Sequence, residues 1–387
     1  MEYISNILRA AARCLARRKP SGFGRRSIIL ALVMGAITSL LGWVAEADAA
    51  MHHAAPHLVF GVYPGGAAGA VGSTGPLQPE DPSKRLRSLE QLRPEHRPFV
   101  LRLYVSYTGA SSPPAAAQVG QEIAQYTASG FRVELVICYR PNDNNAAADV
   151  PGFVDFARKA VDQLGSNPRV VSLQVTNEAN VPGAPNASDG HYAGAWYALI
   201  RGVDGAKAEI DRGGFSQLKV GFNWAYQLDP AETTFWRYLG QHGGSAFLRA
   251  LDWVGVDAYP GTWGPALPKN LDIAGGVRRA TISALSSLRN TYMPLAKIPM
   301  AVPIHVSEGG YPTGPGRTDQ KQSTMLQVGV KAVSDYRATY NVTNYSWFDL
   351  RDANSSSRSF ESQYGLMTDR YTPKPAFSVY HALMSAL

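Results

Sequence analysis

The chain has 387 residues, of which 45% are hydrophobic and 17% charged, and its formal net charge at pH 7 is +7. This composition is typical of a globular protein with enough length for a large core, and it excludes disordered and collagen-like chains. Residues 1–50 hold seven basic and three acidic side chains, which leaves 30 basic against 27 acidic residues, a net charge of +3, in the rest. This remainder shows no charge pattern of the kind that binds nucleic acid.

The N-terminus has the pattern of an export signal. Basic residues precede an apolar run from Ile28 to Val44, and the small-x-small sequence Ala47-Asp48-Ala49 follows it. We expect a signal peptide over 1–49, a linker over 50–56, and a secreted or periplasmic protein. The pair Arg25-Arg26 leaves a twin-arginine route open beside the general one. The apolar run is at the short limit for a membrane span, so an uncleaved signal anchor is the alternative, and we expect no other membrane association.

The chain has two cysteines, Cys14 and Cys138. Removal of the signal leaves one, so the exported chain forms no intrachain disulfide and must be stabilised by its core. We interpret Cys138, which lies in an apolar run, as a small buried residue rather than a nucleophile.

Residues 57–387 repeat one arrangement: a short run rich in β-branched and aromatic residues, a turn, and a longer stretch that can be helical. Their apolar residues are mostly continuous, which is typical of parallel strands covered on both faces. We predict eight strands, over 57–65, 98–107, 132–141, 170–180, 219–227, 251–261, 302–312 and 342–352. Helices are predicted between them, for example over 117–130, 151–165, 190–210 and 322–340.

Eight alternating strands and helices predict an α/β fold, a single-domain (β/α)8 TIM barrel over 57–387. The rival is an open doubly wound sheet, which would bind a ligand at its switch point. The sequence contains neither G-x-G-x-x-G nor G-x-x-x-x-G-K-[ST], so this rival lacks its main support.

In such a barrel, the side chains at the carboxyl ends of the strands converge on one face. The fourth predicted strand ends in "VTNEAN", with Asn177 and Glu178, and the seventh ends in "VSEGG", with Glu308. Glu178 and Glu308 would face each other across the mouth, and paired carboxyls are what glycoside hydrolysis requires. Their proximity would also move their pKa values apart, so that one is an acid while the other is ionised.

These strand ends resemble clan A of the glycoside hydrolases, the retaining β-glycosidases that include families 5 and 39. In that clan an Asn-Glu pair ends strand four and a second Glu ends strand seven. The resemblance implies that Glu178 is the acid/base and Glu308 the nucleophile. It also implies that Asn177 holds the 2-hydroxyl group of the sugar that is cleaved.

Other residues match the clan at single positions. The resemblance implies that Arg102 in "VLRLYV" steadies the nucleophile, that Tyr259 in "VDAYPG" hydrogen-bonds it, and that Trp347 in "YSWFDL" forms the floor under the sugar. A terminal segment over 364–383 is similar to the clan's closing helix. The chain departs from the clan at strand six, where several families have His-x-Tyr and this sequence has Asp257-Ala258-Tyr259.

Further candidates for substrate binding come from the fifth strand and the loop after the sixth. Asn223 could bind a sugar hydroxyl, and Trp224 and Trp263 could each stack on a sugar ring or belong to the core. We find no His, Cys and carboxylate spacing of the zinc type and no G-x-S-x-G elbow. The expected chemistry requires no cofactor and no metal, and we expect a monomer.

The sequence thus predicts a retaining glycoside hydrolase that cleaves β-linked bonds of an extracellular or cell-envelope polysaccharide by double displacement, with endo action. Two alternatives stay open. One is a transglycosylase that remodels an exopolysaccharide with the same residues. The other is a non-catalytic carbohydrate-binding pseudoenzyme on the same scaffold.

Overall fold

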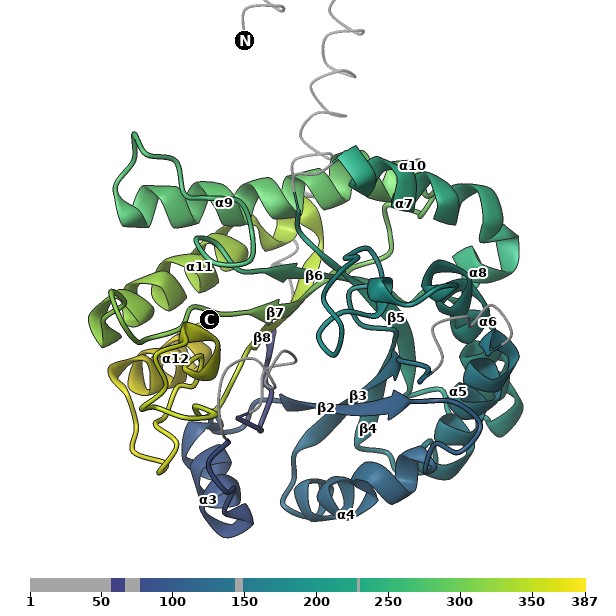
Figure 1. Ribbon diagram of the computed structural model, residues 1–387, viewed down its shortest axis with the longest axis horizontal. Helices are drawn as coiled ribbons and strands as arrows, with labels where there is room; N and C mark the ends of the chain where they lie inside the picture. The colour runs from purple at the N-terminus through teal and green to yellow at the C-terminus, as the bar shows by residue number, and fades with distance from the viewer. Residues whose placement is uncertain (1–56, 67–76, 143–148, 228–229) are drawn as a thin grey trace, which may run out of the picture. The chain divides into compact units, whose positions relative to one another are not determined.

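Eight parallel strands close into a barrel in chain order, with helices around it (Figure 1). The computed structural model describes residues 57–66, 77–142, 149–227 and 230–387, so the expected signal peptide (1–49) and linker (50–56) lie outside the described residues. No helix in these ranges is long and apolar enough to cross a membrane. The predicted (β/α)8 fold is confirmed.

Each strand lies within its predicted range. The barrel closes where β8 pairs with β1, with Asn344 opposite Val59 and Trp347 opposite Val62. The strands are β1 (Val59–Val62), β2 (Phe99–Tyr107), β3 (Arg132–Tyr139), β4 (Val170–Val175), β5 (Lys219–Ala225), β6 (Trp253–Ala258), β7 (Ile304–Gly309) and β8 (Val342–Trp347).

Helices follow the strands and begin at residues suited to capping. Asp81 accepts hydrogen bonds from two backbone N–H groups at the start of α3, and Thr318 does the same for one at the start of α11. The main helices are α3 (Pro82–Leu92), α4 (Ala115–Ala128), α5 (Val150–Leu164), α6 (Ala195–Gly213), α7 (Pro230–His242), α8 (Gly244–Ala250), α9 (Ile273–Ser287), α11 (Asp319–Tyr340) and α12 (Pro375–Ala386).

The four helices named from the sequence are present as α4, α5, α6 and α11. One boundary differs, because α6 begins at Ala195 rather than at 190. Gly194 has φ of 80°, a left-handed conformation that a helix cannot include, and a separate 3-10 turn occupies Asp189–His191.

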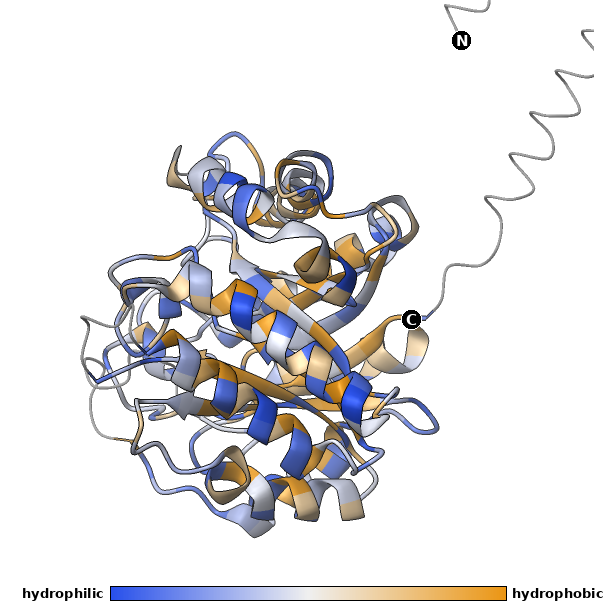
Figure 2. Cartoon of the chain, turned by 90° about the vertical axis from the view of Figure 1, so that its right-hand side faces the viewer, coloured by the Kyte–Doolittle hydropathy of each residue, from blue (hydrophilic) through white to orange (hydrophobic). Residues whose placement is uncertain are grey.

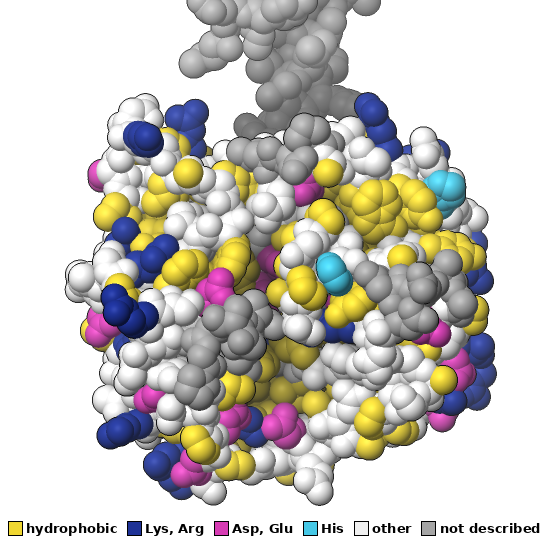
Figure 3. All heavy atoms as spheres, viewed as in Figure 1, with side chains coloured by type: hydrophobic (Ala, Val, Ile, Leu, Met, Phe, Trp, Pro, Cys, Tyr) yellow, Lys and Arg dark blue, Asp and Glu magenta, His cyan; other side chains and the backbone are white. Residues whose placement is uncertain are grey.

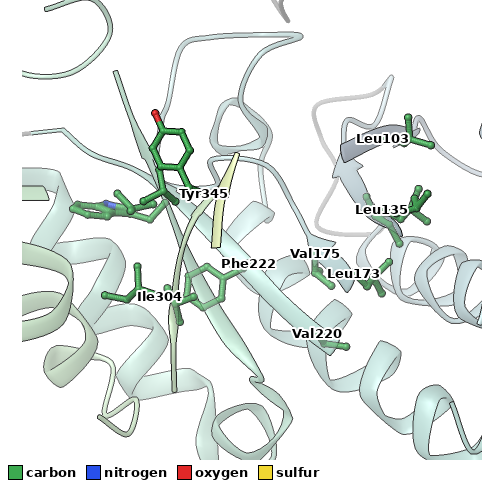
Figure 4. Close-up of a cluster of buried hydrophobic side chains, with 14 of the residues drawn as sticks. Leu103, Leu135, Leu173, Val175, Val220, Phe222, Ile304 and Tyr345 are labelled. Carbon is green, nitrogen blue, oxygen red and sulfur yellow. The ribbon is translucent and has the colours of Figure 1, made fainter. Parts of the chain in front are cut away.

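The core lies between the barrel and the helices. Outward-facing side chains on successive strands are apolar, as Figure 4 shows for Leu103, Leu135, Leu173 and Phe222. Bands of hydrophilic and hydrophobic residues run along the helices, whose apolar sides cover the strands (Figure 2). The residues between them along the strands point into the barrel, and many are polar: Arg102, Glu134, Gln174, Asn223 and Asp257 are all buried.

Substitution of Phe222 tests how much this outer layer contributes to the stability of the fold. Its buried ring lies 5.8 Å from the ring centroid of Trp236 and 6.1 Å from that of Phe247. We predict that Phe222→Ala lowers the free energy of unfolding by about 3–5 kcal/mol in denaturant titrations, because it leaves a cavity. The exposed Tyr197 is the matched control, and Tyr197→Ala should change it by less than about 0.5 kcal/mol. Equal effects of the two substitutions would contradict this placement of the core.

Candidate active site

β4 ends in a strained turn that holds Asn177 and Glu178 at the mouth of the barrel. Thr176 and Glu178 both have left-handed backbone conformations, with φ of 65° and 48°. Such conformations cost about 1–3 kcal/mol each for residues other than glycine. Two hydrogen bonds fix the turn: the Asn177 N–H donates to Asp189 Oδ2 at 2.8 Å, and the Glu178 N–H donates to Asn223 Oδ1 at 2.8 Å.

Glu308, at the end of β7, is held through both of its carboxylate oxygens. Tyr104 on β2 donates its hydroxyl to Oε1 at 2.5 Å, and Tyr259 beyond β6 donates to Oε2 at 2.6 Å. Arg102 Nη2 lies 3.5 Å from Oε1. Burial is the main cause that raises the pKa of both phenols, so they stay protonated and act as donors. Donors from three directions stabilise an ionised Glu308.

Glu178 has the opposite environment. Burial, and then the charge of Glu308, raises the pKa of Glu178 to about 8. Among the residues that the structure describes, one side-chain hydroxyl donates to it, that of Ser188, at 2.5 Å from Oε2. This carboxyl therefore holds a proton at neutral pH, while its neighbour Glu308 has the donors that an anion requires.

The segment that carries Ser188 is fixed by the ion pair between Asp189 and the partly buried Arg140. Asp189 is fully buried and accepts hydrogen bonds from the Asn177 N–H at 2.8 Å and from Arg140 Nε at 3.3 Å. Arg140 Nη2 also donates to the carbonyl of Ala187 at 3.0 Å. Ser188 is thereby held against the carboxyl group on β4.

Arg102 lies beneath Glu308, inside the barrel. It forms a buried ion pair with Glu134 on β3, and its Nη2 donates to Gln174 Oε1 at 3.0 Å and lies 3.3 Å from the Tyr104 hydroxyl. The positive charge is thus shared between a structural acid and the carboxylate above it. Arg102 is placed to orient Glu308 rather than to contact a substrate.

A cavity of about 400 Å³ opens above these residues, on the face that Figure 3 shows. Tyr63 and Phe348 stack in its wall with ring centroids 5.0 Å apart. Gly310 permits this packing, because a Cβ atom there would lie 2.6 Å from the Phe348 carbonyl oxygen and 2.8 Å from the Tyr259 ring. The lining residues are Tyr63, Tyr104, Arg140, Asn177, Glu178, Val181, Ala184, Asn186, Ala187, Ser188, Gln227, Tyr259, Trp263, Glu308, Phe348, Glu361 and Tyr364.

Five of the predicted site residues line this cavity: Asn177, Glu178, Tyr259, Trp263 and Glu308. Trp263 is 48% exposed at the rim, as a stacking platform would be. Asn177 Oδ1 accepts hydrogen bonds from other buried amides, and its Nδ2 donates to Ala187 O at 3.0 Å.

The predictions for two tryptophans are wrong. Trp347 points out of the barrel and packs against α12, with its ring centroid 6.5 Å from that of Tyr380. Trp224 is fully buried on the outer side of β5, where its indole N–H donates to Glu232. Successive residues of a strand point to opposite faces, so Trp347 is one position away from the cavity, and its neighbour Phe348 lines it instead.

Asn223 and Arg102 belong to the site but do not line the cavity. The side chain of Asn223 is fully buried, accepts the Glu178 N–H, and donates to Asn177 Oδ1 at 2.9 Å and to Asp257. All of its groups are engaged within the protein, so the prediction that Asn223 binds a sugar hydroxyl is wrong.

Asp257 is a third acid of the site. Among the described residues, Glu178, Asp257 and Glu308 form the group of acids whose spacing could suit a metal ion, with one oxygen of each within 4.8 Å of the others. Tyrosine, serine and asparagine donors already occupy oxygens of all three. Burial, and then Glu308 and Glu178, raises the pKa of Asp257 well above its ordinary value. We therefore interpret Glu178 and Asp257 as carboxyls that retain their protons beside Glu308.

Comparison with known proteins supports the fold. No protein-family model matches the sequence, and no curated protein matches it. Among solved structures, a fungal β-1,4-galactanase has 13% identity and a TM-score of 0.56, over 84% of this chain and 99% of that protein. A β-glucosidase from Exiguobacterium marinum has 14% identity and a TM-score of 0.56, over 85% and 98%. A family 39 glycoside hydrolase from Bacteroides cellulosilyticus has 14% identity and a TM-score of 0.54, over 85% of this chain but 64% of that protein. The barrel is therefore a fold that glycoside hydrolases share.

The raised pKa of Glu178 has a consequence for stability. Its pKa is about 8 in the folded protein against an ordinary 4.5, so between these pH values the folded state binds more protons and loses stability as pH rises. Glu178→Gln removes this loss. We predict that the free energy of unfolding of Glu178→Gln, relative to wild type, increases between pH 5 and pH 8 in denaturant titrations.

Glu90→Gln, on the exposed face of α3, is the matched control and should give a difference from wild type that hardly changes with pH. If the free energy of unfolding of Glu178→Gln relative to wild type were likewise independent of pH, Glu178 would already be ionised at pH 5.

Proposed function

We propose that this protein is a retaining glycoside hydrolase that cleaves β-linked bonds of a polysaccharide by double displacement. Glu178 is the general acid and base, and Glu308 is the nucleophile. The observation that carries the proposal is the placement of these two carboxyls across one cavity in opposite environments, one protonated and one surrounded by donors.

The separation of the carboxyls favours retention over inversion. Retaining enzymes place them about 5–5.5 Å apart, whereas inverting enzymes need about 6.5–9.5 Å to admit a water molecule. Here one oxygen of Glu178 lies within 4.8 Å of one of Glu308. A sugar bound between them could be attacked directly by Glu308.

The reaction follows from the protonation states. Glu308 Oε attacks the anomeric carbon while Glu178 gives its proton to the departing glycosidic oxygen, which breaks that bond and leaves a glycosyl ester on Glu308. Glu178, now ionised, takes a proton from water, whose oxygen attacks the same carbon and releases Glu308 as a carboxylate. Tyr104 and Tyr259 orient Glu308 for attack and stabilise it again as a leaving group.

The proposal extends to substrate and location. Trp263 at the exposed rim could stack on a sugar beyond the one that is cleaved, which supports endo action on a chain. The export pattern over 1–49 supports an extracellular or cell-envelope polysaccharide as the substrate. Asn177, which lines the cavity beside Glu178, is placed to contact the sugar being cleaved, and the action requires no partner chain.

Alanine substitutions separate the two roles. We predict that Glu178→Ala lowers kcat by about 10²–10⁴, the usual contribution of general acid–base catalysis, and that Glu308→Ala lowers it at least as much. Added azide should restore turnover of Glu308→Ala. The product formed from a β-linked substrate should then have the inverted configuration, which NMR would show. A Glu308→Ala variant with wild-type rates would contradict the assignment.

The control is Glu95→Ala, an exposed acid in the loop before β2, which should retain wild-type rates. A screen of β-glucan, mannan, xylan, galactan and arabinan would supply the substrate, and sizing of the products would show whether hydrolysis or transfer occurs. Products of the wild-type enzyme with inverted configuration would contradict double displacement.

A further inference from the structure

Glu361 is a carboxyl of the cavity that the proposed reaction does not use. It lies on a short 3-10 turn after β8 (Phe360–Ser362), partly buried, and lines the cavity together with Trp263 and Gln227. Its backbone N–H donates to Ser359 Oγ at 3.4 Å, which fixes the turn. Among the described residues, no Lys, Arg or His forms an ion pair with its side chain.

Two of the cations at the cavity, Arg140 and Arg102, are already matched by buried acids. Arg140 is the single Lys or Arg among the described lining residues, and it is paired with the buried Asp189. Arg102 beneath the cavity is paired with Glu134. Arg317 stacks on Phe360, with its guanidinium 4.2 Å from the ring centroid, and does not line the cavity.

The cavity therefore has an excess of negative charge. An ionised Glu308 shares Arg102 with Glu134, and Glu361 has no paired cation. The stretches of 57–387 outside the described residues, 67–76, 143–148 and 228–229, contain two Asp and no Lys or Arg, so they offer no further cation. Figure 3 shows Asp and Glu side chains near the centre of this face and most Lys and Arg side chains toward its periphery.

The neighbours of Glu361 are those of a sugar-binding position. The Trp263 ring is half-exposed, and its centroid lies 6.0 Å from that of Phe360, next to Glu361. An aromatic ring can pack on the apolar face of a sugar, while an adjacent carboxylate accepts hydrogen bonds from its polar edge. Gln227 Nε2, 3.4 Å from the Trp263 carbonyl oxygen, adds a second polar group at the same place.

We propose that Glu361 is a specificity-determining residue, which accepts hydrogen bonds from hydroxyl or ammonium groups of the glycan and disfavours sugars that carry a carboxylate. This inference rests on the proposed function. The physical reason is that charges of like sign in a partly desolvated cavity repel one another, whereas a hydroxyl or ammonium donor stabilises the ionised Glu361. The substrate class is a glycan of uncharged or amino-bearing sugars rather than of uronic acids.

The test compares one glycan in two charge states. The uncharged hexose polysaccharide that the enzyme hydrolyses best is fragmented, and half of the sample has its C6 primary hydroxyls oxidised to carboxylates. We expect wild-type kcat/KM to be lower on the oxidised fragments by about tenfold or more. Glu361→Gln keeps the shape of the side chain but removes its charge. It should lower kcat/KM on the uncharged fragments severalfold and bring the kcat/KM values for the uncharged and oxidised fragments closer together.

The dependence of this ratio on salt concentration distinguishes an effect of the Glu361 charge from an effect of its shape. Raising NaCl to 0.5 M should narrow the wild-type ratio, because the repulsion is screened, and should change the ratio of Glu361→Gln much less. Glu95→Gln, in the loop before β2, is the matched control and should keep the wild-type ratio.

The outcomes are distinct. An unchanged ratio in Glu361→Gln, or an acidic polysaccharide as the best wild-type substrate, would overturn the role of Glu361 and leave the proposed hydrolysis standing. Absence of hydrolysis on every β-glycan would overturn the proposed function, and with it the inference that rests on that function.

Discussion

Two carboxyls whose oxygens lie within 4.8 Å in a buried site cannot both be ionised without a large electrostatic cost, and the rest of the site answers this constraint. Glu308 receives two phenol hydroxyls and a share of a guanidinium, whereas Glu178 receives one serine hydroxyl and keeps a proton. The same asymmetry that stabilises the folded protein suits one group to act as an acid and the other as a nucleophile in the proposed reaction. The distribution of hydrogen-bond donors around Glu178 and Glu308 therefore affects both the stability of the fold and the proposed reaction.

The alternation of side chains along the strands separates the candidate active site from the core. Inward positions carry a connected polar set, in which Glu134 and Gln174 hold Arg102, and Asp257 and Asn223 hold the turn at Glu178. Outward positions on the same strands are apolar and pack against the helices. Hydrophobic burial is thus concentrated in the outer layer, and the barrel interior can be polar because Arg102, Asn223 and Gln174 each form hydrogen bonds with other buried polar side chains.

The fold could be predicted because continuous apolar runs mark strands covered on both faces, and eight of them at regular spacing leave few topologies. Glu178 and Glu308 could be placed because strand ends meet at one face. The orientation of single side chains was harder to predict. Asn223 and Trp224 were both expected at the substrate, although neighbouring residues of a strand point to opposite faces. An error of one position likewise placed Trp347 in the cavity instead of Phe348.

Some residues of the cavity were not predicted from the sequence, and they differ in whether the sequence pattern could have indicated them. Tyr104 is two positions after Arg102 on β2, so it shares its face, and the period of a strand could have placed it beside Glu308. Ser188 and Glu361 lie on loops, where no period relates a side chain to the site. Their positions depend on contacts distant in sequence, such as the pairing of Asp189 with Arg140, and these are visible in the folded structure alone.

Trapping of the glycosyl-enzyme intermediate tests the role of Glu308 most directly. A 2-deoxy-2-fluoro β-glycoside of the sugar that is cleaved slows release of the intermediate, because the fluorine destabilises the positively charged transition state. Proteolysis and mass spectrometry should then find the fluoroglycosyl group as an ester on Glu308, with one group per chain and loss of activity in proportion. A label on Glu178 or Asp257, or turnover of the native substrate with inversion and no label, would contradict the proposed mechanism.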